Sequence, residues 1–100
     1  MLEKLERKPF KFDLNEDAYL TEIEDYLIST YAQHYAKAGT QTVHEIINKG
    51  DGIGFCKGNI RKYLDRYGLK GNEEEARKDI LKAIHYGVLW LIAHDKESKA

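Results

Sequence analysis

The sequence predicts an all-α fold, a compact bundle of about four helices that ends in a helical hairpin and follows an N-terminal arm. Three observations predict it. The single proline, Pro9, lies near the start, so no later residue forces a helix to break. Apolar residues recur at spacings of three and four along most of the chain, and short glycine- and asparagine-containing stretches separate these runs. We therefore assign residues 1–14 to the arm and residues 15–96 to one helical domain.

The first helix should begin at Asn15, a good N-cap, because Glu16 and Asp17 then lie at the positive end of the helix dipole. Its predicted apolar face comprises Tyr19, Leu20, Ile23, Tyr26, Leu27 and Tyr31. Residues 34–39 are expected to form a connector. Thr42 is expected to cap a short second helix over residues 43–48 that points Val43, Ile46 and Ile47 inward, and the glycines of residues 48–52 should end it.

The last two helices should form the hairpin. One is expected over residues 54–67, with Gly68 as its left-handed C-terminal residue, and the next should start after Asn72 as N-cap and run to about His94. The first of these should bury Phe55 or Cys56, Ile60, Tyr63, Leu64 and Tyr67. The second should bury Ala76, Ile80, Ala83, Ile84, Gly87, Val88 and Leu91. Trp90 and Ile92 fall outside that stripe, which indicates a wide buried face or a subunit contact.

Length and composition limit the function classes. A domain of 100 residues is marginally stable without a disulfide, a metal or a partner. Cys56 is the only cysteine, so an internal disulfide is excluded, a reducing cytoplasm is indicated and a homo-oligomer is expected. The formal net charge of −1 argues against general nucleic-acid binding. No apolar run approaches the roughly 20 residues of a membrane span.

A local concentration of positive charge gives the candidate site. Asn59, Lys62 and Arg66 are spaced to share one stripe of the third helix, and a lysine beside an arginine suits phosphate oxygens. Lys57, Arg61 and Lys70 add charge nearby. On the last helix, Asp79, Lys82 and Tyr86 share a stripe, and Asp79 is expected to pair with Arg66 or Lys62 and so hold them in place.

The glycines before this stripe offer a second anion-binding feature. The glycine-rich entry over residues 50–54 would leave N–H groups free at a helix N-terminus, although no P-loop motif is present. Structural readings also exist for each feature. A basic helix face is usually solvated, Gly58 would allow close helix packing, Asp79 with Arg66 would be a structural ion pair, and Cys56 would be a small core residue.

Four segments carry a family resemblance: His34-Tyr35, residues 43–47, the run from Phe55 to Lys70, and residues 79–86. Over about residues 34–92 the chain resembles a bacteriophage family of small helical proteins. Many members are described only as a domain of unknown function. Others are described as nucleotide kinases, by similarity to a coliphage protein that phosphorylates deoxynucleoside monophosphates without a P-loop. The resemblance implies the cytoplasm of an infected host cell as the location.

The leading hypothesis is therefore phosphoryl transfer to a nucleoside monophosphate. Lys62 and Arg66, with Lys70 as a third candidate, would neutralise charge on the transferred group, and Asp79 would orient Arg66 or, as the alternative, accept a hydroxyl proton. A nucleotide would donate the phosphate, and Mg²⁺ is the one candidate metal cofactor. The residues expected to bind substrate are Gly58, Asn59, Lys70, Lys82 and Tyr86.

Two alternatives stay open. A pyrophosphohydrolase related to the MazG type would need a carboxylate cluster for magnesium, and Glu22, Asp25 and Asp79 are its candidates, although the usual E-x-x-E and E-x-x-D pattern is absent. A non-enzymatic protein would bind a host protein, through Phe10, Phe12 and Trp90, or would sequester a nucleotide.

Overall fold

Every regular element in the described part of the chain is a helix, which confirms the all-α prediction. The structure, a computed structural model, describes residues 10–32, 39–69 and 71–98. The four helices are α1 (Glu16–Thr30), α2 (Gly39–Asn48), α3 (Gly52–Arg66) and α4 (Glu73–Ser98). No helix among these residues is long and apolar enough to cross a membrane.

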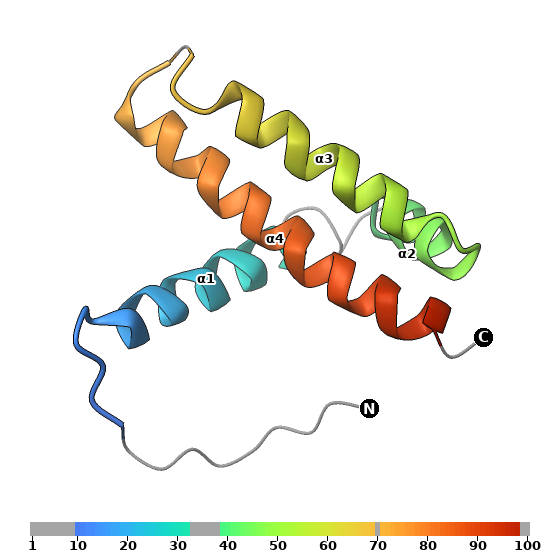
Figure 1. The fold of residues 1–100 in the computed structure, drawn as a ribbon, viewed down its shortest axis with the longest axis horizontal. Coiled ribbons are helices and arrows are strands. Elements are labelled where there is room, and N and C mark those ends of the chain that lie inside the picture. Colours follow the sequence, from blue (N-terminus) through green and yellow to red (C-terminus); the bar gives the residue numbers. More distant parts are fainter. Residues whose placement is uncertain (1–9, 33–38, 70, 99–100) are drawn as a thin grey trace.

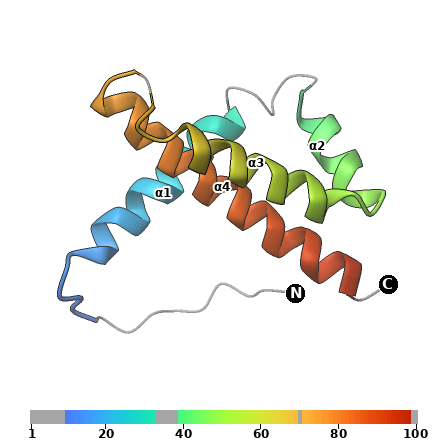
Figure 2. The same ribbon diagram turned by 45° about the horizontal axis from the view of Figure 1, so that its top comes forward.

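The hairpin of α3 and α4 is the centre of the fold. The two helices run antiparallel and make the most extensive helix–helix contact (Figure 1). Among the described helices α1 contacts only α4, on the side away from α3. The short α2 contacts both hairpin helices where α3 begins (Figure 2). The predicted C-terminal hairpin is therefore confirmed.

The turn between α3 and α4 follows the local signals in the sequence. Gly68 has φ of 76°, so it occupies the left-handed conformation that ends a helix and that glycine adopts without steric cost. The Asn72 Oδ1 accepts a hydrogen bond of 2.9 Å from the backbone N–H of Glu75, which caps α4. Both predicted caps are confirmed, and they fix where the second hairpin helix starts.

Three predicted helix boundaries were wrong. Helix α2 begins at Gly39, so Thr42 lies inside it, and α3 begins at Gly52 rather than at residue 54. Helix α4 continues past His94 to Ser98, where the Lys96 ammonium donates to Asn48 Oδ1 over 2.9 Å. At α3 and α4 the added residues make tertiary contacts, Gly52 with Ala93 and Lys96 with Asn48, and such contacts stabilise helix beyond the boundaries that local signals predict.

The predicted cap of α1 is only half right. The helix does follow Asn15, but Asn15 has φ of 63° and its side chain makes no capping hydrogen bond. Instead the Glu16 carboxylate accepts a hydrogen bond of 2.7 Å from the backbone N–H of Leu14. Of the predicted arm, residues 1–9 lie outside the described residues.

The core follows the interface between α3 and α4. Its buried apolar side chains are Ile47, Cys56, Tyr63 and Ala93, which confirms Cys56 as a core residue. Burial raises the pKa of the Cys56 thiol. Helix α1 buries no side chain completely. The described chain therefore has a small core for a domain of its length.

The predicted inward faces of the hairpin were partly wrong. Leu64 is 63% exposed, Tyr67 53%, Ile80 46% and Leu91 63%. Cys56 and Tyr63 of α3 are buried as predicted, whereas the buried residues of α4 at this interface, Asp79 and Ala93, were not among those predicted to face inward. Part of the apolar periodicity therefore faces outward.

Close contact between the hairpin helices occurs at Gly52 and not at Gly58. A β-carbon added to Gly52 would lie 2.8 Å from the Ala93 Cβ and 3.1 Å from the Ile47 Cγ1, whereas one added to Gly54 or Gly58 would meet nothing within 4 Å. The structure therefore contradicts the reading of Gly58 as a packing glycine and gives that role to Gly52.

Replacing Gly52 should destabilise the fold. We expect Gly52→Ala to lower the free energy of unfolding by roughly 1–3 kcal/mol, because the added carbon overlaps Ala93. Gly54→Ala is the matched control in the same helical turn, and it should raise stability by up to about 1 kcal/mol through helix propensity alone. Urea unfolding followed by circular dichroism measures both. Equal effects of the two substitutions would contradict the packing described here.

Candidate functional site

Three cationic side chains converge on the ring of Tyr63. The Lys62 Nζ lies 4.6 Å from the ring centroid, the Arg66 Cζ 4.9 Å and the Lys82 Nζ 5.4 Å. We call Lys62, Arg66 and Lys82 the cationic cluster. Each lies within 5.4 Å of one point, so no two are more than about 10.8 Å apart, comparable to the ~10 Å screening length at 0.1 M salt. Tyr63 holds them by cation–π attraction in spite of their mutual repulsion.

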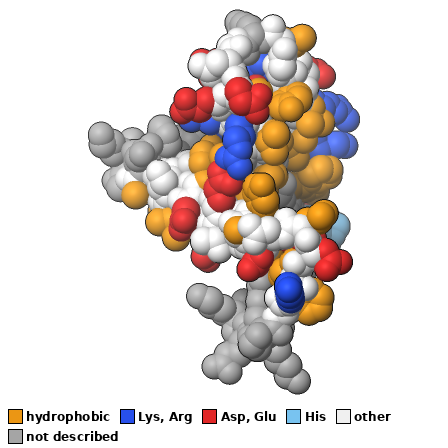
Figure 3. Space-filling view, turned by 90° about the vertical axis from the view of Figure 1, so that its left-hand side faces the viewer, with side chains coloured by type: hydrophobic (Ala, Val, Ile, Leu, Met, Phe, Trp, Pro, Cys, Tyr) orange, Lys and Arg blue, Asp and Glu red, His pale blue; other side chains and the backbone are white. Residues whose placement is uncertain are grey.

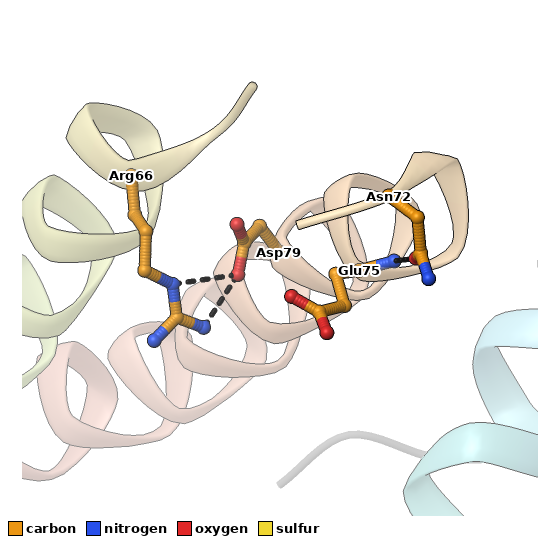
Figure 4. Close-up of polar contacts among 4 residues, drawn as sticks. All are labelled: Arg66, Asn72, Glu75 and Asp79. Atoms are coloured by element: carbon orange, nitrogen blue, oxygen red, sulfur yellow. Dashed lines mark hydrogen bonds and ion pairs between the residues drawn. The ribbon is translucent and has the colours of Figure 1, made fainter. Parts of the chain in front are cut away.

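An ion pair fixes the orientation of Arg66. Asp79 Oδ1 accepts hydrogen bonds from Arg66 Nε at 3.1 Å and Nη2 at 2.5 Å (Figure 4). The Asp79 side chain is 6% exposed and that of Arg66 41%. The hydrogen bonds from Arg66 hold the pKa of the Asp79 carboxyl below its usual value despite burial, and Asp79 in turn raises the pKa of Arg66.

This pairing leaves part of the guanidinium available. Asp79 occupies the Nε side of the fork, while Nη1 has no hydrogen-bond partner within the described residues. The outer pair of nitrogens, Nη1 and Nη2, can still bind an anion in two-point fashion. The contact between Asp79 and Arg66 that the sequence predicted is therefore present, and it fixes the orientation of the guanidinium.

A polar cavity of about 310 Å³ lies beside the ion pair. It is lined by Arg66 of α3 and by Glu75, Lys78, Asp79 and Lys82 of α4. Together with Lys62 these residues carry four positive and two negative charges, so the surroundings of the cavity are positive on balance. Among the described residues neither Lys62 nor Lys82 forms an ion pair with an acid. The cavity is therefore suited to an anionic ligand.

Aromatic side chains extend the site along the hairpin. The rings of Tyr63 and Tyr86 are stacked, with centroids 6.0 Å apart, and Phe55 meets Tyr86 edge to face at 5.8 Å. Asn59 Nδ2 donates to the backbone carbonyl of Phe55 over 2.9 Å, which leaves its Oδ1 as an acceptor. Tyr86 and Asn59 thus belong to the same edge of the hairpin as the cationic cluster.

The structure does not bring every predicted site residue to this edge. Gly58 is exposed with open space around it and does not line the cavity. The glycine-rich entry, proposed as an anion-binding helix N-terminus, packs instead against α4, where Gly52 is buried beside Ala93. Lys70 lies outside the described residues.

Sequence reasoning missed three contributors to the site. Lys78 and Glu75 line the cavity because they precede Lys82 by four and seven residues on α4, a spacing that was visible in the sequence. Tyr63 was assigned to the core, and it is buried, but its ring also gathers the three cations. The sequence does contain a signal for this arrangement: Lys62 precedes Tyr63 directly, and Arg66 follows Tyr63 by about one helical turn.

Two of the three carboxylates proposed as magnesium ligands are engaged elsewhere. Glu22 forms an ion pair with Arg77, with one hydrogen bond of 2.8 Å from Nη2, and this bonding lowers the pKa of Glu22. Asp79 is held by Arg66. In the ranges that the structure covers, no three histidine, cysteine or acidic side chains gather as a metal site. The pyrophosphohydrolase alternative therefore gains no carboxylate cluster from the fold.

A larger hollow of about 380 Å³ lies between α1, α2 and α4. Its lining is mostly apolar and includes Leu27, Ile47, Val88 and Ile92. His85 also borders it, and burial lowers the pKa of this imidazole. Without a convergent set of charges, this hollow has less chemistry to offer an anion than the smaller polar cavity.

One family model matches more than half of the chain. It is described as Protein of unknown function (DUF3310) and matches residues 29–87, a range that contains the cationic cluster and Asp79. No curated protein and no solved structure matches the chain.

The Arg66–Asp79 pair should make stability depend on pH. Aspartate in an unfolded chain has a pKa of about 3.9, and the folded pKa of Asp79 is lower, so the pair stabilises the fold above about pH 3.9. This contribution is lost as the pH falls through the folded pKa. Asp79→Asn should therefore be less stable than wild type at neutral pH, and the gap should close in acid.

Chemical denaturation across the acidic range measures this gap. Asp65→Asn, which removes an exposed acid of α3 that forms no ion pair with the residues the structure describes, is the control and should show little difference from wild type at any pH. A gap for Asp79→Asn that stays constant down to strong acid would contradict the ion pair.

Proposed function

The chain belongs to the DUF3310 family, and from its own site we propose that it binds a phosphorylated nucleotide at the edge where α3 meets α4. The observation that carries this proposal is the convergence of Lys62, Arg66 and Lys82 on one ring beside a polar cavity. On the resemblance described above, we also propose that it is a bacteriophage protein that acts in the cytoplasm of the infected host.

Charge supports a phosphate as the bound group. Three cations held within a few ångströms of one ring repel one another, and a dianion placed among them replaces repulsion with attraction. Arg66 supplies a planar fork and the two lysines supply point charges, a combination that matches phosphate oxygens. A volume of about 310 Å³ is within the range of small-ligand pockets.

The neighbouring aromatics support a nucleotide over a bare phosphate. Phe55 and Tyr86 are half-buried and adjoin the cationic cluster through Tyr63, so they offer ring surface for a base. Asn59 lies one helical turn before Lys62 and Tyr63 and offers an amide oxygen to a base N–H group. Cations at one end and rings with an amide at the other match the two ends of a nucleotide.

The reaction that fits this site best is phosphoryl transfer to a nucleoside monophosphate. An oxygen of the acceptor phosphate bonds to the terminal phosphorus of a donor nucleoside triphosphate while that phosphorus separates from its bridging oxygen, which keeps the bonding electrons. Two diphosphates result. A phosphate monoester is largely deprotonated at neutral pH, so its attack needs no general base. Asp79 is then free to remain bound to Arg66, while the cationic cluster stabilises charge on the moving group.

Removing single cations should weaken nucleotide binding. We expect Lys62→Ala and Lys82→Ala each to raise the Kd for a nucleoside monophosphate by roughly 10-fold or more, the loss of one charge-assisted contact. Lys57→Ala, an exposed lysine on α3 outside the cluster, is the control of equal charge and should leave the Kd unchanged. Isothermal titration calorimetry with a panel of nucleoside mono-, di- and triphosphates and inorganic phosphate measures these values. Absence of binding by wild type across the panel would reject the proposal.

In the proposed reaction, Arg66 contributes two parallel hydrogen bonds to the phosphate as well as its positive charge. We expect wild type, given a magnesium nucleoside triphosphate and a monophosphate, to form two diphosphates that are visible by phosphorus NMR. Arg66→Lys keeps the charge but loses two-point contact, so its kcat should fall on the order of 100-fold, with KM changed far less. Binding without any diphosphate product would reject the kinase and indicate a protein that sequesters a nucleotide.

A further inference from the structure

One face of the hairpin is apolar, and no other described helix covers it. Leu64 and Tyr67 of α3 line a shallow pocket of about 300 Å³ there together with Ile80 and Ile84 of α4. Tyr63, Asp79 and Ala83 line the same pocket, so Tyr63 and Asp79 border both this face and the candidate site. Leu91 continues the α4 stripe, seven residues after Ile84. We call Leu64, Tyr67, Ile80, Ile84 and Leu91 the apolar hairpin face. Figure 3, seen from the end where α3 turns into α4, shows a band of hydrophobic side chains with lysine and arginine side chains beside it.

This face is not covered by the other described helices. All residues lining the shallow pocket belong to α3 and α4. Helix α1 packs against another side of α4, through Glu22 with Arg77 and Tyr26 with His85. Within the described residues four apolar side chains are buried in the core, whereas four large ones on this face, Leu64, Tyr67, Ile80 and Leu91, are 46–63% exposed. An apolar stripe of the two hairpin helices therefore remains on the surface. An exposed apolar patch of this kind is typical of an interaction site.

We propose that a second copy of this chain covers the apolar hairpin face, so that two hairpins pack face to face around a two-fold axis. Two adjacent helices form a face about 20 Å wide, and the 15 residues of α3 give it a length of about 22 Å. The flat area of this footprint is about 440 Å², and side-chain relief enlarges the accessible area, so each copy would bury an area at the small end of the interface range, below the roughly 800 Å² per partner of a standard interface. The result is a four-helix arrangement with its apolar stripes inside.

Charge favours a second copy as the occupant. The centre of the face carries no net charge, because the single acid that lines its pocket, Asp79, is paired with Arg66. Two copies can therefore place these pockets against each other around a two-fold axis without bringing unpaired acids together. A partner with a charged binding face would find no counter-charge there. The cationic cluster lies along the other edge of the hairpin and stays open in such a dimer.

The test is the mass of the chain in solution, measured by analytical ultracentrifugation over a concentration series. Wild type should sediment at twice its chain mass of 11.6 kDa. Leu64→Glu and Leu91→Glu, each made alone and then together, should shift the protein to monomer at concentrations where wild type is dimeric, since a two-fold interface contains each substitution twice. Both leucines are 63% exposed in the single chain, so the substituted chain should keep its helical circular dichroism.

Ile28→Glu is the matched control. Ile28 is 60% exposed on α1, away from the apolar hairpin face, and its substitution should leave the dimer intact. A wild type that stays monomeric at its highest soluble concentration would overturn the proposal. So would a dimer that persists in the Leu64→Glu, Leu91→Glu double variant, or one that only Ile28→Glu dissociates. These outcomes do not depend on nucleotide, so they stand apart from the tests of the proposed function.

Discussion

The ion pair between Arg66 and Asp79 joins the two hairpin helices at the point where the candidate site begins. A buried carboxylate needs a partner, because removing an unpaired charge from water is strongly unfavourable. Asp79 has that partner in Arg66, and the contact sets the relation between the end of α3 and the start of α4. The turn caps at Gly68 and Asn72 hold the same end of the hairpin. The positions of Lys62 and Lys82 relative to each other follow from this junction.

The two edges of the hairpin have different chemistry, and each edge therefore suits a different partner. One edge gathers Lys62, Arg66 and Lys82 around Tyr63 and borders a polar cavity. The other carries exposed leucine, isoleucine and tyrosine side chains. A nucleotide on the first edge and a second copy on the second would occupy the hairpin without competing. Because the core of a single chain is small, such a dimer would also bury apolar surface that the single chain leaves exposed.

Features with local causes could be predicted from the sequence, and features set by packing could not. The left-handed Gly68, the Asn72 cap and the Arg66–Asp79 pair each depend on a few neighbouring residues or on one charge match across a short turn. The inward faces were harder, because periodicity shows that a helix has an apolar stripe but not which partner covers it. Leu64 and Leu91 were therefore placed inside when they face outward. Gly52 was assigned to an anion-binding entry from its glycine-rich neighbours. Its packing role could not be predicted, because Ala93, which it contacts, lies 41 residues later in the sequence.

In the proposed complex, the guanidinium of Arg66, already held by Asp79, receives a nucleotide phosphate. The most direct measurement is an NMR titration of a nucleoside monophosphate into ¹⁵N-labelled protein that follows the Nε–H signal of Arg66, identified by its loss in Arg66→Lys. That signal and the backbone amides at the end of α3 should shift together and saturate, while those of α1 stay in place. Saturable shifts confined to α1 and α2, with the Arg66 signal unmoved, would place the ligand elsewhere and contradict the account.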